Sequence, residues 1–305
     1  MKHLSCAGYA WRIITVHIEK LLKETEKICL SGGDVEAVHQ ARVASRRLRN
    51  SFWVFGDMLP EKKLKLWREV LRGGAAVLGG ARDLDIQILF IEGFLGDAGK
   101  KKYRDELSAL LSYLTKKRTA MKQDLMAISG GLIKSGVLPM IVDTVRELSE
   151  KDKKNGRMKL YSLAKDRIWK RLTALLAYDV YVRQSESSEE LHKMRIAAKK
   201  LRYTLENFAP LYGKRTERYI SSAHALQDIL GELHDLDVWV ASFPELAAEY
   251  AKAGKKDAGV KWFTKKCSEK RAVVYDRFIE LWDNIKLSGE WEDLASFVTS
   301  FDYSM

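Results

Sequence analysis

The chain has 305 residues, with 53 Lys and Arg against 41 Asp and Glu and a formal net charge of +12. Hydrophobic residues make up 46% of it, enough apolar material for a core, which excludes an intrinsically disordered chain. The excess of positive charge predicts an acidic partner. With only 4 prolines and long stretches rich in Leu, Ala, Glu, Lys and Arg, the composition favours helices over strands.

Signals for export or membrane insertion are weak. The N-terminal segment lacks the apolar core of a secretory signal, and no uncharged apolar run reaches the roughly 20 residues of a membrane helix. Cys6, Cys29 and Cys267 are an odd number and have no C-x-x-C spacing, which argues against a disulfide framework or a structural zinc site. We therefore expect a cytoplasmic protein without a membrane partner.

The first recognisable element is a helix over residues 34–55. Asp34 is its expected N-cap, directly after Gly32 and Gly33. At about 100° per residue, the apolar side chains gather on one side and a basic stripe lies on the other. The first stripe consists of His39, Arg42, Arg46 and Arg49. From His39 to Phe55 the helix has no acidic residue, whereas a solvated helix face usually mixes both signs.

A second motif, Leu-Gly-Gly-Ala-Arg-Asp-Leu-Asp, follows at residues 78–85. Basic residues lie on either side of it, among them Arg68, Arg72 and Arg118. Arg68 and Arg72 are four positions apart and could reach the same groove, but for most of these residues solvated surface is favoured because acids lie between them. Of the two aspartates in the motif, we expect one to orient a basic side chain from a neighbouring helix. The other is expected to end or cap its own helix.

Both motifs recur in the second half of the chain. Residues 192–202 repeat residues 39–49 at an offset of 153, and residues 230–237 repeat residues 78–85 at an offset of 152. The polar segment 151–156 between the halves contains a helix-breaking glycine and is the candidate linker. We predict an internal duplication, with an N-terminal helical bundle at 1–150 and a C-terminal helical bundle at 151–305.

The second basic helix begins at Ser187, which with Glu190 three residues later predicts a capping box. The second stripe consists of His192, Arg195, Lys199 and Arg202. Arg47 and Lys200 project to a third side of their helices. Tyr203 lies beside the second stripe and is a candidate donor of a hydroxyl hydrogen bond to phosphate.

The residue types of the stripes indicate anion binding. Arginine presents a planar fork of donors, lysine a compact ammonium, and histidine a donor whose charge responds to mild acid. Positions i, i+3, i+7 and i+10 recur about once per turn and form a row about 15 Å long. Such a row suits a linear polyanion better than a single phosphate.

A metal-dependent reaction is disfavoured by the spacing of the acids. Asp235 and Asp237 are two positions apart, hence about 200° apart around a helix, and cannot both face one metal ion. At the position of His234 the first half has Arg82, which is not a metal ligand. We therefore expect no metal, no cofactor and no catalysis.

The two motifs together resemble the CHAD domain, the conserved histidine α-helical domain. The first motif, on a helix, is His-x-x-Arg-x-x-x-Arg/Lys-Arg/Lys-Leu-Arg. The second, which follows it, is Leu-Gly-x-x-x-Asp-Leu-Asp. The resemblance implies an all-α fold of two pseudo-symmetric four-helix bundles that bind inorganic polyphosphate in a basic channel or surface between them. Carried over position by position, it marks as binding residues His39, Arg42, Arg46, Arg47, Arg49, His192, Arg195, Lys199, Lys200 and Arg202. The match departs at Arg82, which leaves the role of that position open.

These observations lead to one expected function and two alternatives. We expect non-catalytic binding of polyphosphate by two basic helices facing a shared cleft, which targets the protein to cellular polyphosphate, including granules. One alternative is a protein that binds the backbone of RNA or DNA, for which Asn50, Trp53 and Tyr203 are the few candidates for base contacts. The other is a metal-dependent phosphohydrolase.

Overall fold

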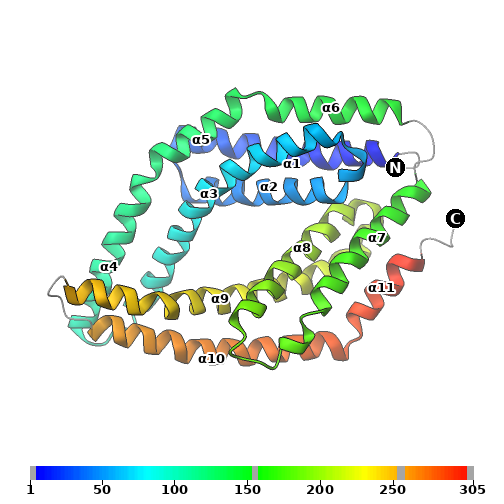
Figure 1. Ribbon diagram of the computed structural model, residues 1–305. Helices are drawn as coiled ribbons and strands as arrows, with labels where there is room; N and C mark the ends of the chain where they lie inside the picture. Colours follow the sequence, from blue (N-terminus) through cyan, green and yellow to red (C-terminus); the bar gives the residue numbers. More distant parts are fainter. Residues whose placement is uncertain (1–4, 153–156, 253–257, 301–305) are drawn as a thin grey trace. The chain divides into compact units, whose positions relative to one another are not determined.

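The computed structural model describes residues 5–152, 157–252 and 258–300, and it is all-α as the sequence predicts (Figure 1). Over these residues the chain forms α-helices and short 3-10 helices and no strand. The helices of the first half are α1 (Cys6–Ser31), α2 (Val35–Val54), η1 (Gly56–Met58), α3 (Glu61–Leu95), α4 (Lys101–Ala120), α5 (Lys122–Lys134) and α6 (Val137–Lys151). Those of the second half are α7 (Arg157–Leu176), η2 (Asp179–Tyr181), α8 (Ser188–Tyr212), η3 (Gly213–Thr216), α9 (Glu217–Lys252), α10 (Ala258–Leu287) and α11 (Glu290–Ser300). Most of the candidate linker, residues 153–156, lies outside the described residues.

The helices form two compact units, and the first turns of α4 belong to the second one. The first unit takes the described residues up to Asp97 and from Ser108 to Leu160, and residues 98–107 join the described residues from Tyr161 onwards. Tyr103 stacks on Trp262 of α10 with ring centroids 5.5 Å apart. Gly259 approaches so closely that a Cβ there would lie 2.9 Å from Glu106 Oε2. The division therefore differs from the predicted ranges 1–150 and 151–305 at residues 98–107 and at the described residues between 151 and 160.

In the first unit, α1 is the central helix. It contacts α2, α5 and α6, and α2 in turn contacts α3. Ile14, Ile18 and Leu21 of α1 are fully buried, as are the large rings of Phe52 on α2 and Trp67 on α3. These residues recur at helical spacing on one side of each helix, so burial of that side determines which side remains for polar groups.

In the second unit, α9 is the central helix. It contacts α8, α10 and α11. The core contains Phe208, Tyr219, Phe263, Phe278 and Trp282, all less than 2% exposed. The helices with the two repeated motifs, α2 then α3 and α8 then α9, follow each other in the same order in both units. Beyond the expected four α-helices, the first unit also contains α5 and α6, and the second contains α11.

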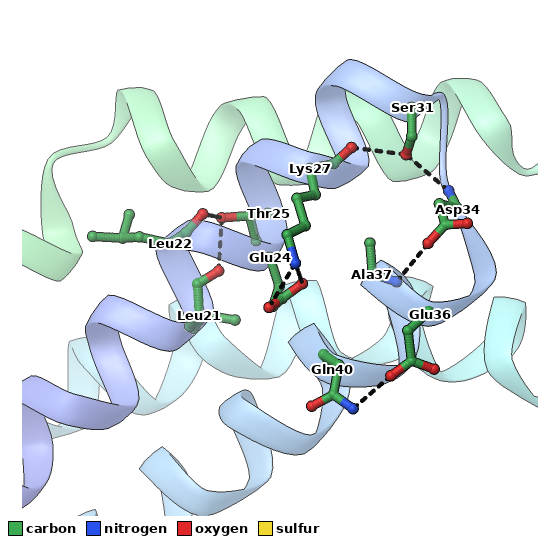
Figure 2. A network of polar contacts seen from close by, with 10 residues as sticks. All are labelled: Leu21, Leu22, Glu24, Thr25, Lys27, Ser31, Asp34, Glu36, Ala37 and Gln40. Atoms are coloured by element: carbon green, nitrogen blue, oxygen red, sulfur yellow. Dashed lines mark hydrogen bonds and ion pairs between the residues drawn. The ribbon is translucent and has the colours of Figure 1, made fainter.

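The corner between α1 and α2 follows the predicted chemistry. Gly32 and Gly33 adopt positive φ angles of 67° and 92°, a conformation open to glycine. Asp34 then caps α2, with its carboxylate accepting a 2.9 Å hydrogen bond from the Ala37 amide (Figure 2). In the same view the Ser31 hydroxyl accepts from the Asp34 amide and donates to the carbonyl of Lys27. The prediction of Asp34 as N-cap is confirmed.

The predicted capping box at the start of α8 is wrong. Ser187 is the N-cap residue, but its side chain makes no cap hydrogen bond. Its hydroxyl instead donates to the side-chain oxygen of Gln184 at 3.1 Å. Glu190 lies 3.6 Å from Lys193 Nζ. The nearby ammonium offers this carboxylate a charged partner in place of a backbone amide.

A buried ion pair ties the start of α2 to α3 and α4. Arg118 Nε donates to Asp85 Oδ1 at 2.7 Å, and Arg118 Nη2 donates to the carbonyl oxygen of Gly33 at 2.9 Å. The side chains of Arg118 and Asp85 are 9% and 3% exposed. Arg118 is therefore not solvated surface, and Asp85 does not cap its own helix, which corrects both predictions. Buried charges of opposite sign stabilise each other where water cannot.

The second unit contains the corresponding arrangement at residues offset by 152 or 153. Arg271 Nε donates to Asp237, and Arg271 Nη2 donates to the carbonyl oxygen of Ser185 at 2.7 Å, just before α8. Each unit thus secures the beginning of its basic helix with one arginine and the second aspartate of the Asp-Leu-Asp segment. This repeated contact favours the predicted duplication.

One stretch is more apolar than the sequence analysis recognised. Lys101–Lys151 contains an 18-residue window with mean hydropathy 1.7, long and apolar enough to cross a membrane, of which 22% is buried. The stretch is interrupted at Gly136, whose φ is 63°, and both α5 and α6 contact α1. Core helices of soluble proteins pass the same test of length and composition, so the absence of a membrane partner stays a prediction.

We predict that Arg118→Met lowers the free energy of unfolding by about 3–5 kcal/mol, because it leaves the buried carboxylate of Asp85 without its cation. Urea denaturation followed by circular dichroism measures the change. Lys116→Met, the same loss of charge at an exposed site on α4, is the control and should leave the midpoint nearly unchanged. Equal midpoints for the two variants would contradict a stabilising role for the pair.

Candidate anion-binding faces

The first basic face lies on α2 where it contacts α3, and Arg42 is anchored there. Arg42 Nη1 donates to the carbonyl oxygen of Gly79 at 2.7 Å and to Asp83 Oδ1 at 2.8 Å. A Cβ at Gly79 would lie 3.6 Å from Arg42 Nη1, so the guanidinium rests directly on the glycine of the Leu-Gly motif. The prediction that one aspartate of the motif orients a basic side chain from a neighbouring helix is confirmed for Asp83.

Beside Arg42 a pocket of about 280 Å³ opens between α2 and α3. We call it the arginine pocket, and its lining consists of Arg42, Ser45, Arg46, Arg49, Arg72, Ala75 and Ala76. Four of these side chains are cationic and none is acidic. Three members of the first stripe are thus brought together, and Arg72, interpreted from sequence as surface, joins them from α3. The run of small residues 73–76 after Arg72 was the signal, because it leaves space beside the arginine.

His39 lies at the N-terminal end of the same face and is half-buried. Burial lowers the pKa of its imidazole, and the cations Arg82, Arg46 and Arg42 lower it further, while Glu36 opposes them. Without a bound anion, His39 is therefore neutral at pH 7. Arg82, the position at which the two halves differ, belongs to the electrostatic surroundings of this histidine.

The second basic face lies on α8 where it contacts α9. The ring of His192 packs against that of His234, with centroids 3.9 Å apart and an interplanar angle of 36°. Burial lowers the pKa of His192, and Arg195 and Lys199 lower it further. His192 Nδ1 is buried and has no hydrogen-bond partner among the described residues. Sequence reasoning missed the pairing with His234 because the two residues are on different helices.

Arg195 occupies the position on this face that corresponds to Arg42. A Cβ at Gly231 would lie 3.5 Å from Arg195 Nε, so this guanidinium also rests on the glycine of a Leu-Gly motif. The Nε atom is buried without a hydrogen-bond partner in the described part of the chain. Both glycines leave space for an arginine from the neighbouring helix, which is the physical role of the Leu-Gly pair.

The second face is shorter than the predicted stripe. Arg202 and Tyr203 are 7% and 4% exposed, and the Arg202 guanidinium lies over the Tyr203 ring at 4.8 Å. All residues from Leu201 to Leu205 are buried, so α8 is enclosed on every side at this level. Arg202 also lies 3.6 Å from Glu206 Oε1. Arg202 and Tyr203 are thus not accessible, and the half-buried row on α8 extends from His192 to Lys199.

The residues predicted on a third side of the helices lie apart from both faces. Arg47 does not line the arginine pocket. Lys200 lines a different pocket, between α7 and α8. Within the described residues, no group of three or more His, Cys, Asp or Glu side chains is placed to hold a metal ion.

Comparison with known proteins agrees with this architecture. The family model of the CHAD domain matches residues 12–243. The crystal structure of the CHAD domain from the plant Ricinus communis is similar over 92% of both chains, with 21% identity and a TM-score of 0.69. PptA from Streptomyces chartreusis is similar over 91% of this chain and 99% of its own, with 15% identity and a TM-score of 0.56.

At these identities the two structures show a shared fold, and no curated protein matches the sequence. The match to the family model covers both basic helices and both Asp-Leu-Asp segments. The chain belongs to the CHAD domain family.

Proposed function

We propose that this protein binds inorganic polyphosphate through its two basic faces and does not catalyse its turnover. The arginine pocket carries the proposal, because four arginines from two helices line one pocket whose lining has no acidic residue. Arg42 is paired with Asp83, which lies outside the lining, and the lining itself carries a net positive charge that attracts an anion. A phosphate group of a polymer is an anion of suitable size, charge and hydrogen-bonding capacity.

The geometry favours a linear anion over an isolated one. The cations from His39 to Arg49 recur about once per turn along α2, so successive phosphates of one chain can each meet a different side chain. On α8 the row from His192 to Lys199 repeats this arrangement over about 10 Å. Affinity then comes from charge-assisted hydrogen bonds and from the release of counterions.

The proposed role is that of a binding and targeting module in the cytoplasm, which brings the chain to polyphosphate and its granules. Binding of this kind breaks no covalent bond, and the side chains that line the arginine pocket are mainly hydrogen-bond donors. The CHAD family membership and the fold shared with PptA support the proposal.

Nucleic acid fits the observed surface less well. Two of the three candidates for base contacts, Asn50 and Tyr203, are 8% and 4% exposed. Proteins that bind single-stranded nucleic acid usually present exposed aromatic rings on which bases stack. The faces thus offer contacts to a phosphate backbone but few to bases, which favours a polyanion without bases.

We predict that Arg46→Ala/Lys199→Ala, which removes one cation from each face, weakens binding of long-chain polyphosphate about tenfold or more. The slope of log affinity against log salt should become shallower by about 1–2, because fewer counterions are released. Calorimetric titration at two salt concentrations measures both quantities. A single-stranded RNA of similar charge, titrated in parallel, should bind much more weakly at physiological salt.

The matched control is Lys65→Ala/Lys265→Ala, which removes the same charge from exposed positions outside both faces. Equal effects of the two double variants would mean that only net charge matters and would contradict the proposed faces. RNA binding as tight as polyphosphate binding would favour the nucleic-acid alternative. Release of phosphate from polyphosphate in the presence of Mg²⁺ or Mn²⁺ would favour the phosphohydrolase.

We predict that affinity for polyphosphate increases as the pH falls. His39 and His192 have lowered pKa values in the free protein, below the ordinary 6.5, and a bound polyanion raises them by stabilising the charged imidazoles. Binding is therefore accompanied by proton uptake. The gain in affinity is complete below the free-protein pKa values and is lost as the pH rises through those of the complex.

Titration in two buffers of different ionisation enthalpy counts the protons taken up. His39→Gln/His192→Gln should abolish this uptake and flatten the pH profile. A wild-type profile that is already flat would remove the histidines from the contact residues.

A further inference from the structure

A second basic pocket lies inside the second unit, between α7 and α8. It has a volume of about 260 Å³ and is lined by Arg171, Ala174, Tyr178, Lys193, Ile196, Ala197 and Lys200. Its four residues on α8 are spaced i, i+3, i+4 and i+7 and therefore share one side of that helix. This side is turned by roughly 100° from the row that contains His192, Arg195 and Lys199. The pocket is thus a separate place on the molecule from the second basic face.

The charges that line this pocket have one sign. Three of the lining side chains, Arg171, Lys193 and Lys200, are cationic, and none is acidic. Lys193 is balanced by Glu189, 2.7 Å from its Nζ, on the exposed side of α8. Lys200 has no ion pair among the described residues. The pocket therefore has the charge of a site for an anion.

The lowered pKa values of two of these side chains agree with a site for an anion. Burial lowers the pKa of Arg171 to about 10, with Arg167 on the preceding turn adding to the effect. Burial and the charge of Arg171 lower the pKa of Lys200. In each case the protonated form is disfavoured by the protein alone, and a bound anion relieves this.

The two units differ at one position of the helix that precedes the basic helix. Both helices bury apolar side chains at the same spacing, Ile14, Ile18 and Leu21 on α1 and Ile168, Leu172 and Leu175 on α7. Three residues after the first isoleucine, α1 has half-buried His17, whereas α7 has half-buried Arg171. Arg171 is thus a cation that the second unit has and the first does not.

The remaining lining residues and the volume of the pocket indicate the chemical class and size of the ligand. Ala174, Ile196 and Ala197 are apolar, and Tyr178 adds an aromatic ring. The volume is just below the range of roughly 300–1,000 Å³ for sites of drug-sized ligands, so the ligand is compact. We propose that the pocket between α7 and α8 binds a small phosphate ester, with its phosphate on Arg171, Lys193 and Lys200 and its organic group against Tyr178 and Ile196.

Adenosine monophosphate serves as the probe, titrated calorimetrically into the full chain. We expect saturable binding that Arg171→Met weakens about tenfold or more, since hydrogen bonds to charged groups contribute about 1.5–3 kcal/mol. Lys170→Met is the matched control, because it removes the same charge from the next residue of α7, outside the pocket lining. Lys200→Met provides a second variant in case Arg171→Met fails to fold.

Nuclear magnetic resonance locates the ligand independently of affinity. The δ1 methyl signal of Ile196 should shift on addition of the probe, and pyrophosphate tests whether the organic group contributes. Absence of saturable binding, or equal affinities of the Arg171→Met and Lys170→Met variants, would overturn the site. Pyrophosphate binding without binding of the adenosine ester would overturn the assignment to an ester. Because this pocket is separate from both basic faces, the result does not depend on polyphosphate binding.

Discussion

The arrangement of the basic helices depends on the opposite directions of two aspartates in one short segment. Asp83 and Asp85 are two positions apart on α3, so they point to different sides of the helix. The outward one holds Arg42 at 2.8 Å, and the inward one holds buried Arg118 at 2.7 Å. Arg118 also binds the carbonyl oxygen of Gly33, directly before α2. The same segment thus orients one cation for a ligand and secures the helix that carries it.

The separate roles of the two aspartates explain how a strongly basic surface coexists with a stable fold. Interior charge is balanced inside each unit by pairs such as Asp85 with Arg118 and Asp237 with Arg271. The arginine pocket is different, because its lining contains four arginines and no acid, and Asp83, the partner of Arg42, lies outside the lining. The net positive charge of the lining attracts an anion. The proposed ligand and the stability of the fold are in this way thermodynamically linked.

The two units share the order of their basic helices and Asp-Leu-Asp segments, but the residues around the basic helices differ. His39 is near the guanidinium of Arg82, whereas the ring of His192 packs against the imidazole of His234. The first face extends into an arginine pocket, and the second is cut short where α8 becomes enclosed at Leu201. In the second unit, half-buried Arg171 of the preceding helix lines a pocket with residues of the basic helix, whereas α1 has His17 three residues after buried Ile14, where α7 has Arg171 three residues after Ile168. These differences predict that the two faces contribute unequally to the proposed binding of polyphosphate.

The sequence by itself determined the helical class, the repeat, the N-cap at Asp34 and the basic side of each helix, because these follow from local composition and from helical periodicity. Extending the offset of 153 would also have paired Arg118 with Arg271. Only the tertiary structure decided that Arg202 and Tyr203 are buried, that Arg72 joins the arginine pocket and that Arg171 meets Lys200. Periodicity tells which side of a helix a residue occupies, but burial and partners depend on which other helix covers that side.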